Sequence, residues 1–336
     1  MIPIQLRMNL ESLEAAAAAG LAFLETSFNH STGISVDCTG STRKSLKKSK
    51  TLPAERFTSI LFLDLLGDKM KPSTYQDVVN LLKPTKEGVV QLYQYYFTYT
   101  DFPDDIDDTC FLYYVFLKEK LLKRDNSIFE VARLISENTG NLEVGAPNES
   151  VMKVYMPPCD DFRRNRVDAC VLSNAMRFLY AIGCESLAKP TEEFLIDWLV
   201  SRKYLNGAWH YFSPQVFLYL YAKAVRENKE LFHKLREIIL GELESLDEDS
   251  EHPLDVSLYV LIFYTVAPST QIEDAKWKVK VQGQVGRLMG MQEKNGNWPM
   301  DALYKMPRSE TYVGGYSLST MFATAALYEH LKHSKV

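Results

Sequence analysis

Four carboxylates within five residues are the side chains of this chain best suited to chemistry. They are Asp104, Asp105, Asp107 and Asp108, and the strongly apolar run 110–117 follows almost directly. Ionised acids this close repel one another, and burial further penalises the charged form, so one of them could stay protonated near neutral pH. A carboxylic acid kept neutral in a hydrophobic pocket is a proton donor. The alternative is an Asp-rich loop that caps a helix at the surface.

Helices must position these acids. Apolar residues recur at three- and four-residue spacing along most of the chain, whereas strand-like alternation is scarce. Including one helix after Thr109, the pattern predicts about a dozen helices separated by prolines and loops, in an all-α chain with a single domain over residues 1–336. The other predicted helices are 10–24, 57–66, 75–82, 128–134, 171–180, 191–199, 214–225, 231–243, 254–266, 279–291 and 318–331.

Two segments, 199–209 and 288–298, align without gaps. Each has a helix end, a polar stretch, an Asn-Gly turn and a tryptophan. Gly207 and Gly296 suit the left-handed turn that ends a helix, and Trp209 and Trp298 can pack back across neighbouring helix ends. Weaker echoes lie near Gly33 and Gly140. Such repeated hairpins indicate repeat architecture, and a chain of this length could close into a helical barrel.

The two motifs together resemble a known family. The segment from Gln292 to Trp298 resembles the Gln-Trp repeat of squalene-hopene and oxidosqualene cyclases, although the first repeat has Lys203 in place of Gln. The segment from Asp105 to Thr109 resembles the D-x-D-D-T signature of class II terpene cyclases. Softer similarity covers 167–174, 211–214, 252–255 and 312–319. Because the chain has room for one α/α barrel, it is most similar to the single-domain class II cyclases.

This resemblance implies a single α/α barrel (toroid) with degenerate Gln-Trp repeats. It also implies a protonation-initiated cyclisation that needs no cofactor and no metal. The implied substrate is a prenylated aromatic acid of the farnesyl-dihydroxybenzoate kind, closed to a fused polycyclic meroterpenoid. In the family pattern the middle acid, Asp107, is the donor, and Asp105 and Asp108 tune and orient it. Asp104 is then a loop residue.

One electrostatic force opposes a neutral acid at this position. The motif lies at the start of a predicted helix, where the helix dipole favours the ionised form by ~0.3–1 kcal/mol. Burial can shift the pKa of an acid by up to ~3–5 units, at ~1.4 kcal/mol per unit. We therefore expect burial and like charge to dominate in a dry site.

Other interpretations of these motifs remain open. The nearest is a diphosphate-retaining class II cyclase of farnesyl or geranylgeranyl diphosphate; a non-catalytic helical-repeat binding module is another. Asp104-Asp105-x-x-Asp108 also matches the magnesium motif of class I terpene synthases, but the sequence has no second metal motif. Asp168-Ala-Cys170 resembles part of the zinc site of protein prenyltransferase β subunits, with Val313 at the expected His position. Cys170 is then better interpreted as a small core residue.

Aromatic residues beside turns are candidates for the substrate pocket, since aromatic faces stabilise cations by ~0.5–2 kcal/mol each. We predict that Tyr155, Phe212 and Tyr312 line it, with ordinary core packing as the alternative for each. Asn174, a polar residue on an apolar helix, is predicted to orient the acid or the substrate. The cluster Arg163–Arg166 could bind an anionic group or form a salt-bridged loop. The sequence does not identify the terminating base.

Bulk composition limits the remaining classes. The chain has 336 residues, 46% hydrophobic, and a net charge of −5. Its one basic cluster, 43–50, is expected to be a solvated surface loop, and nucleic-acid binding is disfavoured. Five cysteines without a C-x-x-C indicate reduced thiols, so we expect a cytoplasmic protein. We also expect no obligatory protein partner. Apolar runs are too short to span a bilayer, which leaves peripheral membrane contact open.

Overall fold

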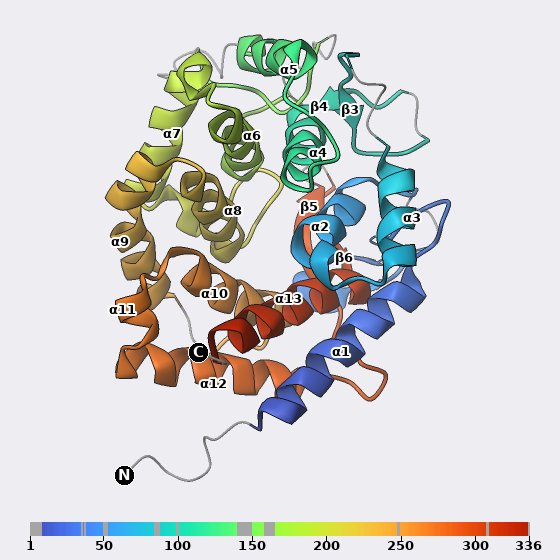
Figure 1. Cartoon of the computed structure of the whole chain (residues 1–336), viewed down its shortest axis with the longest axis vertical. Helices are drawn as coiled ribbons and strands as arrows, with labels where there is room; N and C mark the ends of the chain where they lie inside the picture. Colours follow the sequence, from blue (N-terminus) through green and yellow to red (C-terminus); the bar gives the residue numbers. More distant parts are fainter. Residues whose placement is uncertain are drawn as a thin grey trace.

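Six helices form a closed inner ring in the computed structural model (Figure 1), which describes residues 9–34, 36, 38–49, 53–83, 88–98, 101–139, 150–157, 165–246, 249–306 and 309–334. Each helix packs on the next, and the last packs on the first. They are buried on nearly every face, as helices enclosed on all sides should be. The ring consists of α2 (Phe57–Leu66), α4 (Ile106–Lys118), α6 (Ala169–Ile182), α8 (Pro214–Arg226), α10 (Pro253–Val266) and α13 (Tyr316–Ser334).

An outer layer of amphipathic helices surrounds this ring. In α5, for example, Ile128, Val131, Ala132 and Ile135 are buried, which is one stripe at helical spacing. The outer helices are α1 (Leu10–Ser27), α3 (Pro72–Leu82), α5 (Asn126–Glu137), α7 (Lys189–Val200), α9 (Lys229–Ser245), α11 (Ser269–Ile272) and α12 (Ala275–Met291). The predicted α/α barrel is therefore confirmed, and every predicted helix is present; only the short α11 was not predicted.

The Gln-Trp segment links two helices of the outer layer, α12 and α1. The Nε2 of Gln292 donates hydrogen bonds to the carbonyl oxygens of Ala16 and Gly296, both at 2.9 Å, so it ties the end of α12 to α1. Trp298 is fully buried, and its Nε1 donates to the carbonyl oxygen of Leu288 at 2.6 Å. Gly296 has φ +91°, and a Cβ there would lie 2.6 Å from the carbonyl oxygen of Ala19. The turn therefore requires glycine.

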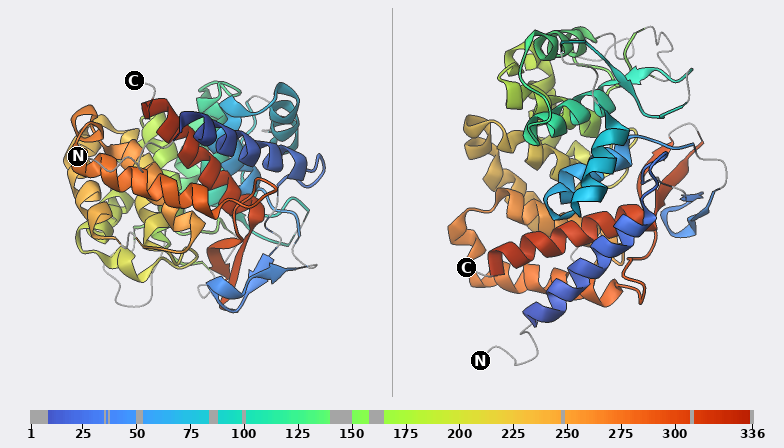
Figure 2. Two further views of the ribbon diagram at one scale, coloured as in Figure 1. Left: turned by 90° about the horizontal axis from the view of Figure 1, so that it is seen from below. Right: turned by 45° about the vertical axis from the view of Figure 1, so that its right-hand side comes forward.

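Short strands, which the sequence did not predict, add two small antiparallel sheets. Because these strands have only two to six residues, they leave almost no period-two pattern. One sheet has the order β2-β1-β6-β5 and lies beside the inner ring (Figure 2). The other pairs β3 with β4 in front of α4. The strands are β1 (Cys38–Gly40), β2 (Lys47–Lys48), β3 (Tyr93–Gln94), β4 (Asp104–Asp105), β5 (Asp301–Met306) and β6 (Thr311–Gly315).

We predicted that residues 43–50 form a solvated surface loop, and this prediction is wrong for Arg43. Lys50 lies outside the described residues. The side chain of Arg43 is only 15% exposed, and its guanidinium donates to Asp255 at 2.7 Å and to Asp301 at 2.6 Å. Both acids lie more than 200 positions away in sequence, at the start of α10 and in β5. Local charge density could not reveal these partners.

The inner helices begin at one end of the ring and finish at the other. Side chains from the starts of α4, α6 and α8 meet around Asp107, as described below. At the opposite end, Lys118 and Arg177 form ion pairs with Asp64, which lies late in α2. The acid motif therefore belongs to the end where the helices begin.

Candidate active site

The start of α4 is fixed on two sides. Asp105 is its N-cap residue, and its Oδ1 accepts a hydrogen bond from the backbone N–H of Asp108 at 2.7 Å. The next backbone N–H, that of Ile106, donates to the carbonyl oxygen of Val154 at 2.9 Å. Asp104 pairs with Gln94 of β3 and is exposed. The other three acids point into the protein.

Asp107 is the meeting point of three inner helices. It is 7% exposed. Asn174, from α6, donates through Nδ2 to Oδ1 of Asp107 at 2.7 Å. Tyr211, just before α8, donates through its hydroxyl to Oδ2 at 2.7 Å. Both carboxyl oxygens thus have a donor, and the carboxyl group is held in one orientation.

Burial keeps these acids protonated at a higher pH than usual. Burial, with the charge of Asp168 adding to it, raises the pKa of Asp107 to about 6, although the hydrogen bonds from Asn174 and Tyr211 oppose this rise. Burial also raises the pKa values of Asp105 and Asp108 well above their usual range, and the charges of neighbouring carboxylates add to this. The three groups titrate as a coupled set. A proton therefore remains available in this cluster near neutral pH.

The hydrogen bonds at Asp107 favour the state after the proton has left. Two donors stabilise a carboxylate, whereas a neutral acid must itself donate to something. Oδ1 of Asn174 is buried and has no hydrogen-bond partner among the described residues. Rotation of the Asn174 amide would turn this oxygen toward Asp107, where it would accept the acid proton. The same residue can thus serve both protonation states.

Asp168 and His210 form a second polar group beside Asp107. Asp168 is the N-cap residue of α6, and its Oδ1 accepts from the backbone N–H of Cys170 at 2.8 Å. Its Oδ2 accepts from the backbone N–H of His210 at 2.6 Å, and Nδ1 of that ring lies 3.2 Å away. Asp168 and Cys170 therefore act in helix capping and core packing here. Within the described residues, no three His, Cys, Asp or Glu side chains gather as a metal site.

An aromatic layer lies against Asp107. The ring of Tyr211 is 6.3 Å from those of Phe57 and Tyr304, and Phe57 is 5.7 Å from Phe111. The hydroxyls of Tyr304 and Tyr95 share a hydrogen bond. We call these five residues the aromatic layer. Their faces are suited to stabilising a positive charge formed beside Asp107.

The predicted lining residues divide into two places. Tyr155 forms a backbone bridge with Asp105, and the centroid of its ring lies 5.6 Å from that of Phe102, so Tyr155 lies beside the acid motif. Phe212 and Tyr312 instead pack on each other, with ring centroids 4.8 Å apart. They belong to a smaller hydrophobic cluster with Cys38, Leu46 and Ala302.

We predicted Phe212 as a lining residue of the substrate pocket. The side chain that contacts Asp107 is that of its neighbour, Tyr211. The two are adjacent just before α8, but Tyr211 donates to Asp107 whereas Phe212 packs on Tyr312. A hydroxyl-bearing ring next to an apolar one was the available signal, because a buried tyrosine needs a partner for its hydroxyl. Arg166 lies over the ring of Trp209 at 4.3 Å, while Arg163 and Arg164 lie outside the described residues.

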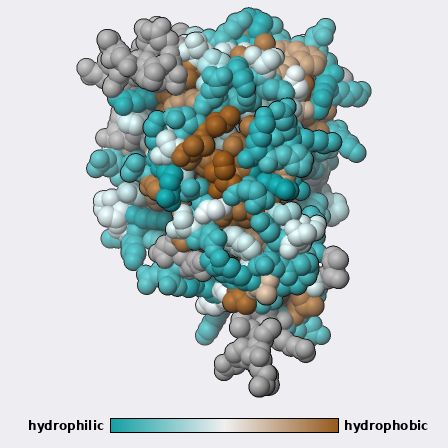
Figure 3. Space-filling model, turned by 90° about the vertical axis from the view of Figure 1, so that its left-hand side faces the viewer, coloured by the Kyte–Doolittle hydropathy of each residue, from teal (hydrophilic) through white to brown (hydrophobic). Residues whose placement is uncertain are grey.

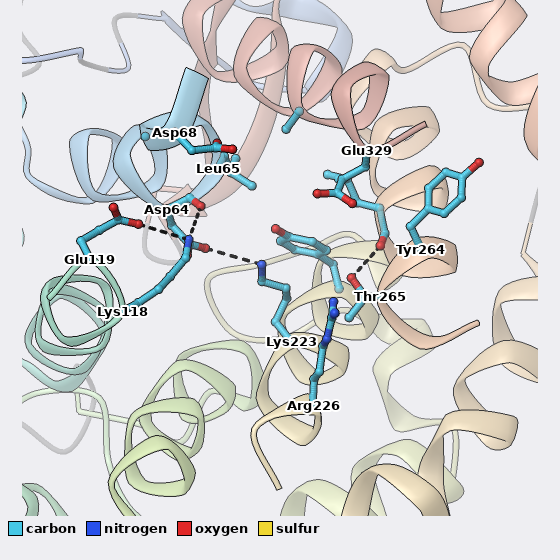
Figure 4. Close-up of a pocket in the computed structure, with 14 residues that line it drawn as sticks. Asp64, Leu65, Asp68, Lys118, Glu119, Lys223, Arg226, Tyr264, Thr265 and Glu329 are labelled. Atoms are coloured by element: carbon cyan, nitrogen blue, oxygen red, sulfur yellow. Dashed lines mark hydrogen bonds and ion pairs between the residues drawn. The ribbon is translucent and has the colours of Figure 1, made fainter. Parts of the chain in front are cut away.

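A pocket of about 380 Å³ lies at the opposite end of the ring (Figure 4). It contains Asp64, and although burial opposes this, the positive charges of Arg177, Lys223 and Lys118 lower the pKa of that carboxyl well below its usual range. Cations here also offset the negative ends of the inner helix dipoles. An acid that ionises so readily is no proton donor at neutral pH, so this pocket does not compete with Asp107 for that role.

Comparison with known proteins bears on the fold of the chain. No family model matches the chain. A drimenol cyclase from Aspergillus calidoustus is 26% identical over 175 residues, which is 51% of this chain and 31% of that protein. The match therefore spans about a third of the relative's length.

Solved structures match over nearly the whole chain. A variant of the type II terpene cyclase MstE from Scytonema, in complex with its product merosterolic acid A, matches with TM-score 0.66 and 12% identity. That match covers 96% of this chain and 98% of MstE. A heparin-specific unsaturated glucuronyl hydrolase also matches, with TM-score 0.55 and 12% identity over 97% of this chain and 98% of its own, so the barrel alone does not decide chemistry. The chain has the α/α-barrel fold of the type II terpene cyclases, as its two motifs predicted.

Proposed function

We propose that this chain is a class II terpene cyclase that starts cyclisation by protonating the end of a polyprenyl chain. The single observation that carries the proposal is the environment of the Asp107 carboxyl group. It is buried, its pKa is raised to about 6, and it is held by Asn174 and Tyr211. The D-x-D-D-T pattern and the barrel fold agree with this role.

The first step is a proton transfer from Asp107. Its O–H bond breaks, and the terminal alkene of the substrate uses its π electrons to bind the proton, which leaves a tertiary carbocation. Asn174 and Tyr211 then hold the new carboxylate by hydrogen bonds to a charged acceptor, each worth ~1.5–3 kcal/mol. Because these bonds are strongest after the transfer, they lower the barrier rather than stabilise the ground state. Asp105 and Asp108 orient and tune the donor.

The following steps are ring closures. Each remaining alkene attacks the cation in turn, and the positive charge moves along the chain. The aromatic layer contributes ~0.5–2 kcal/mol of cation stabilisation per face and keeps water away. Loss of a proton, or capture by a hydroxyl group, ends the reaction.

For the substrate we propose a prenylated aromatic acid. MstE variants have been solved with geranylgeranyl dihydroxybenzoate, named as the substrate, which supports this class. Its tail has one isoprene unit more than the farnesyl chain that the sequence suggested. Tyr155 is proposed to contact the substrate near the acid motif. Phe212 and Tyr312 are proposed as lining farther along it.

A second candidate is a cyclase of a linear isoprenoid such as farnesyl diphosphate. The match to drimenol cyclase favours it, because drimenol is a bicyclic sesquiterpene alcohol without an arene. Both candidates use the same proton donor and differ at the far end of the substrate.

The surface of the described chain bears on where the protein acts. No helix within the described residues is long and apolar enough to cross a membrane. Figure 3 shows apolar side chains gathered on one face of the molecule, and Val200 and Ile238 on the outer helices are exposed. We propose a cytoplasmic location with peripheral membrane contact. We also propose that catalysis needs neither a cofactor nor a protein partner.

The test is incubation with farnesyl- and geranylgeranyl-dihydroxybenzoate and with the two diphosphates, with and without EDTA. A new product of unchanged mass from a benzoate, made also in EDTA, supports the first candidate, and one made from a diphosphate supports the second. Asp107→Asn should make neither product, whereas the control Asp197→Asn, at an exposed position of α7, should behave as wild type. An Asp107→Asn variant with normal turnover would refute the mechanism.

A further inference from the structure

Three hydrogen-bond donors from α8 meet in the pocket at the end of the ring opposite Asp107. Tyr219, Lys223 and Arg226 all line this pocket of about 380 Å³. Their spacing of four and then three positions places them on the same side of the helix. Figure 4 shows the side chains of Lys223 and Arg226 extending from that helix into the pocket. One wall of the pocket can therefore donate hydrogen bonds and carries two positive charges.

The acids that line the pocket have nearer partners than these two cations. The pairs are Asp64 with Arg177 at 3.0 Å, Asp68 with Lys69 at 2.6 Å, Glu119 with Lys118 at 3.7 Å and Glu329 with Lys332 at 3.8 Å. The Nζ of Lys223 lies 3.9 Å from Oδ2 of Asp64, which is beyond hydrogen-bond distance. Once each acid is matched with its nearer cation, the charges of Lys223 and Arg226 are left over.

Two of the three donors have no hydrogen-bond partner among the described residues. They are the guanidinium of Arg226 and the hydroxyl of Tyr219. Tyr219 is nevertheless only 3% exposed. Burial raises the pKa of its hydroxyl above the usual range, so the group stays neutral and keeps a proton to donate. A buried tyrosine hydroxyl that lines a pocket without a protein partner points to a ligand that accepts from it.

Stabilisation of the helix end is a simpler role for these charges, but it does not account for them. Cations in the last turn of a helix contribute ~0.3–1 kcal/mol and hold their protons more tightly. Burial instead lowers the pKa of Lys223 to about 8, and the positive charges of Arg177, Lys118 and Arg226 add to this against the charge of Asp64. Lys223 is thus a cation that lacks sufficient negative charge around it.

We propose that this pocket binds a small phosphate monoester, with Tyr219, Lys223 and Arg226 donating to the phosphate oxygens. A phosphate group accepts several hydrogen bonds, and arginine can bind two of its oxygens at once. Two surplus positive charges match the two negative charges that a phosphate monoester carries at pH 8, whereas a carboxylate would leave one positive charge unmatched. The site lies apart from Asp107 and does not depend on the proposed function.

The rest of the pocket suits the organic part of such an ester. Leu65, Leu261 and Ala325 also line it and offer apolar contacts. A volume of about 380 Å³ falls within the range of small-molecule sites, ~300–1,000 Å³. We therefore expect an ester with a small apolar group to bind more tightly than phosphate alone.

The test is isothermal titration calorimetry at pH 8 with phenyl phosphate, inorganic phosphate and phenol as separate probes. Phenyl phosphate should bind at millimolar concentration or below and more tightly than inorganic phosphate, and phenol should not bind. Arg226→Gln should weaken binding of phenyl phosphate ~10–100-fold, the range for loss of a hydrogen bond to a charged group. Lys229→Gln is the matched control, because Lys229 is exposed at the start of α9 and does not line the pocket.

Proton uptake separates this site from general attraction of an anion. A bound phosphate dianion should raise the pKa of Lys223, so binding at pH 8 should take up to about half a proton from solvent. Titrations in buffers of different ionisation enthalpy measure this uptake. The uptake should disappear in Lys223→Gln and stay unchanged in Lys229→Gln.

Absence of binding to the wild type, or an unchanged affinity of Arg226→Gln, would overturn the proposal. Should Lys223→Gln fail to fold, Tyr219→Phe, which keeps the ring, should bind phenyl phosphate more weakly, and wild-type affinity of that variant would also count against the site. Asp107→Asn should bind phenyl phosphate as the wild type does, because Asp107 lies at the other end of the ring. A failure of the proposed function therefore leaves this test unaffected.

Discussion

Replacing Asp107 with asparagine should stabilise the folded protein at alkaline pH. The pKa of Asp107 is raised from 3.8 to about 6 by folding. The folded protein therefore holds this proton more tightly than the unfolded chain does. Stability from this group is complete below the unfolded pKa and is lost as the pH rises through the folded pKa. Asparagine is neutral throughout and avoids that loss.

The shift sets the size of the effect. About two pKa units at ~1.36 kcal/mol each make ~3 kcal/mol, of which about half is lost between pH 5 and pH 8. Hydrogen bonding changes less, because the new amide can accept from Tyr211 and donate to the unpartnered oxygen of Asn174. We expect Asp107→Asn to gain ~1.5 kcal/mol on wild type between these two pH values, or ~2 °C in Tm for a chain of this size.

The assay is urea unfolding of both proteins at pH 5 and pH 8, with thermal unfolding as a second readout. The difference between the two pH values is the quantity to compare, since it cancels any fixed packing change. Asp197→Asn, at an exposed position, should show no such gain. An equal stability difference at both pH values would mean that Asp107 is not held protonated by burial, and the reasoning would fail.

Three further predictions follow from the same contacts. Tyr211→Phe removes one of the two donors to Asp107, and the loss of ~1.5–3 kcal/mol should reduce turnover ~10–100-fold while far-UV circular dichroism stays unchanged. In single turnover, the rate of substrate consumption should fall as the pH rises through about 6, because Asp107 then loses the proton it donates; a flat profile would contradict this. Trp298→Phe loses a buried hydrogen bond to Leu288 and should destabilise by ~1–3 kcal/mol in urea. Trp198→Phe should change stability less, because its Nε1 has no partner among the described residues.

The parts of the fold that could be predicted are those that repeat locally. Apolar residues every three or four positions predicted the helices, and glycine with a following tryptophan predicted the turn at Gly296. The β5–β6 hairpin has no comparable period and depends on pairing with β1, far away in sequence. Arg43 was misjudged for the same reason, since its partners are Asp255 and Asp301.

The candidate site shows the same division. Asp107 was predicted from its place in the D-x-D-D-T pattern, and Asn174 was predicted because it is a polar residue in an apolar helix; the structure joins them by a hydrogen bond of 2.7 Å. Tyr211 and Phe212 are adjacent in sequence, so only the packing of the barrel decides which one contacts the acid.

The most direct test of the central claim is a reaction in deuterium oxide with the substrate that wild type converts. Protonation by Asp107, whose proton exchanges with solvent between turnovers, predicts one carbon-bound deuterium in each product molecule. Product mass should therefore be about one unit higher than in ordinary water, and Asp107→Asn should form no product. A cyclised product without deuterium, or a labelled product from Asp107→Asn, would contradict the account.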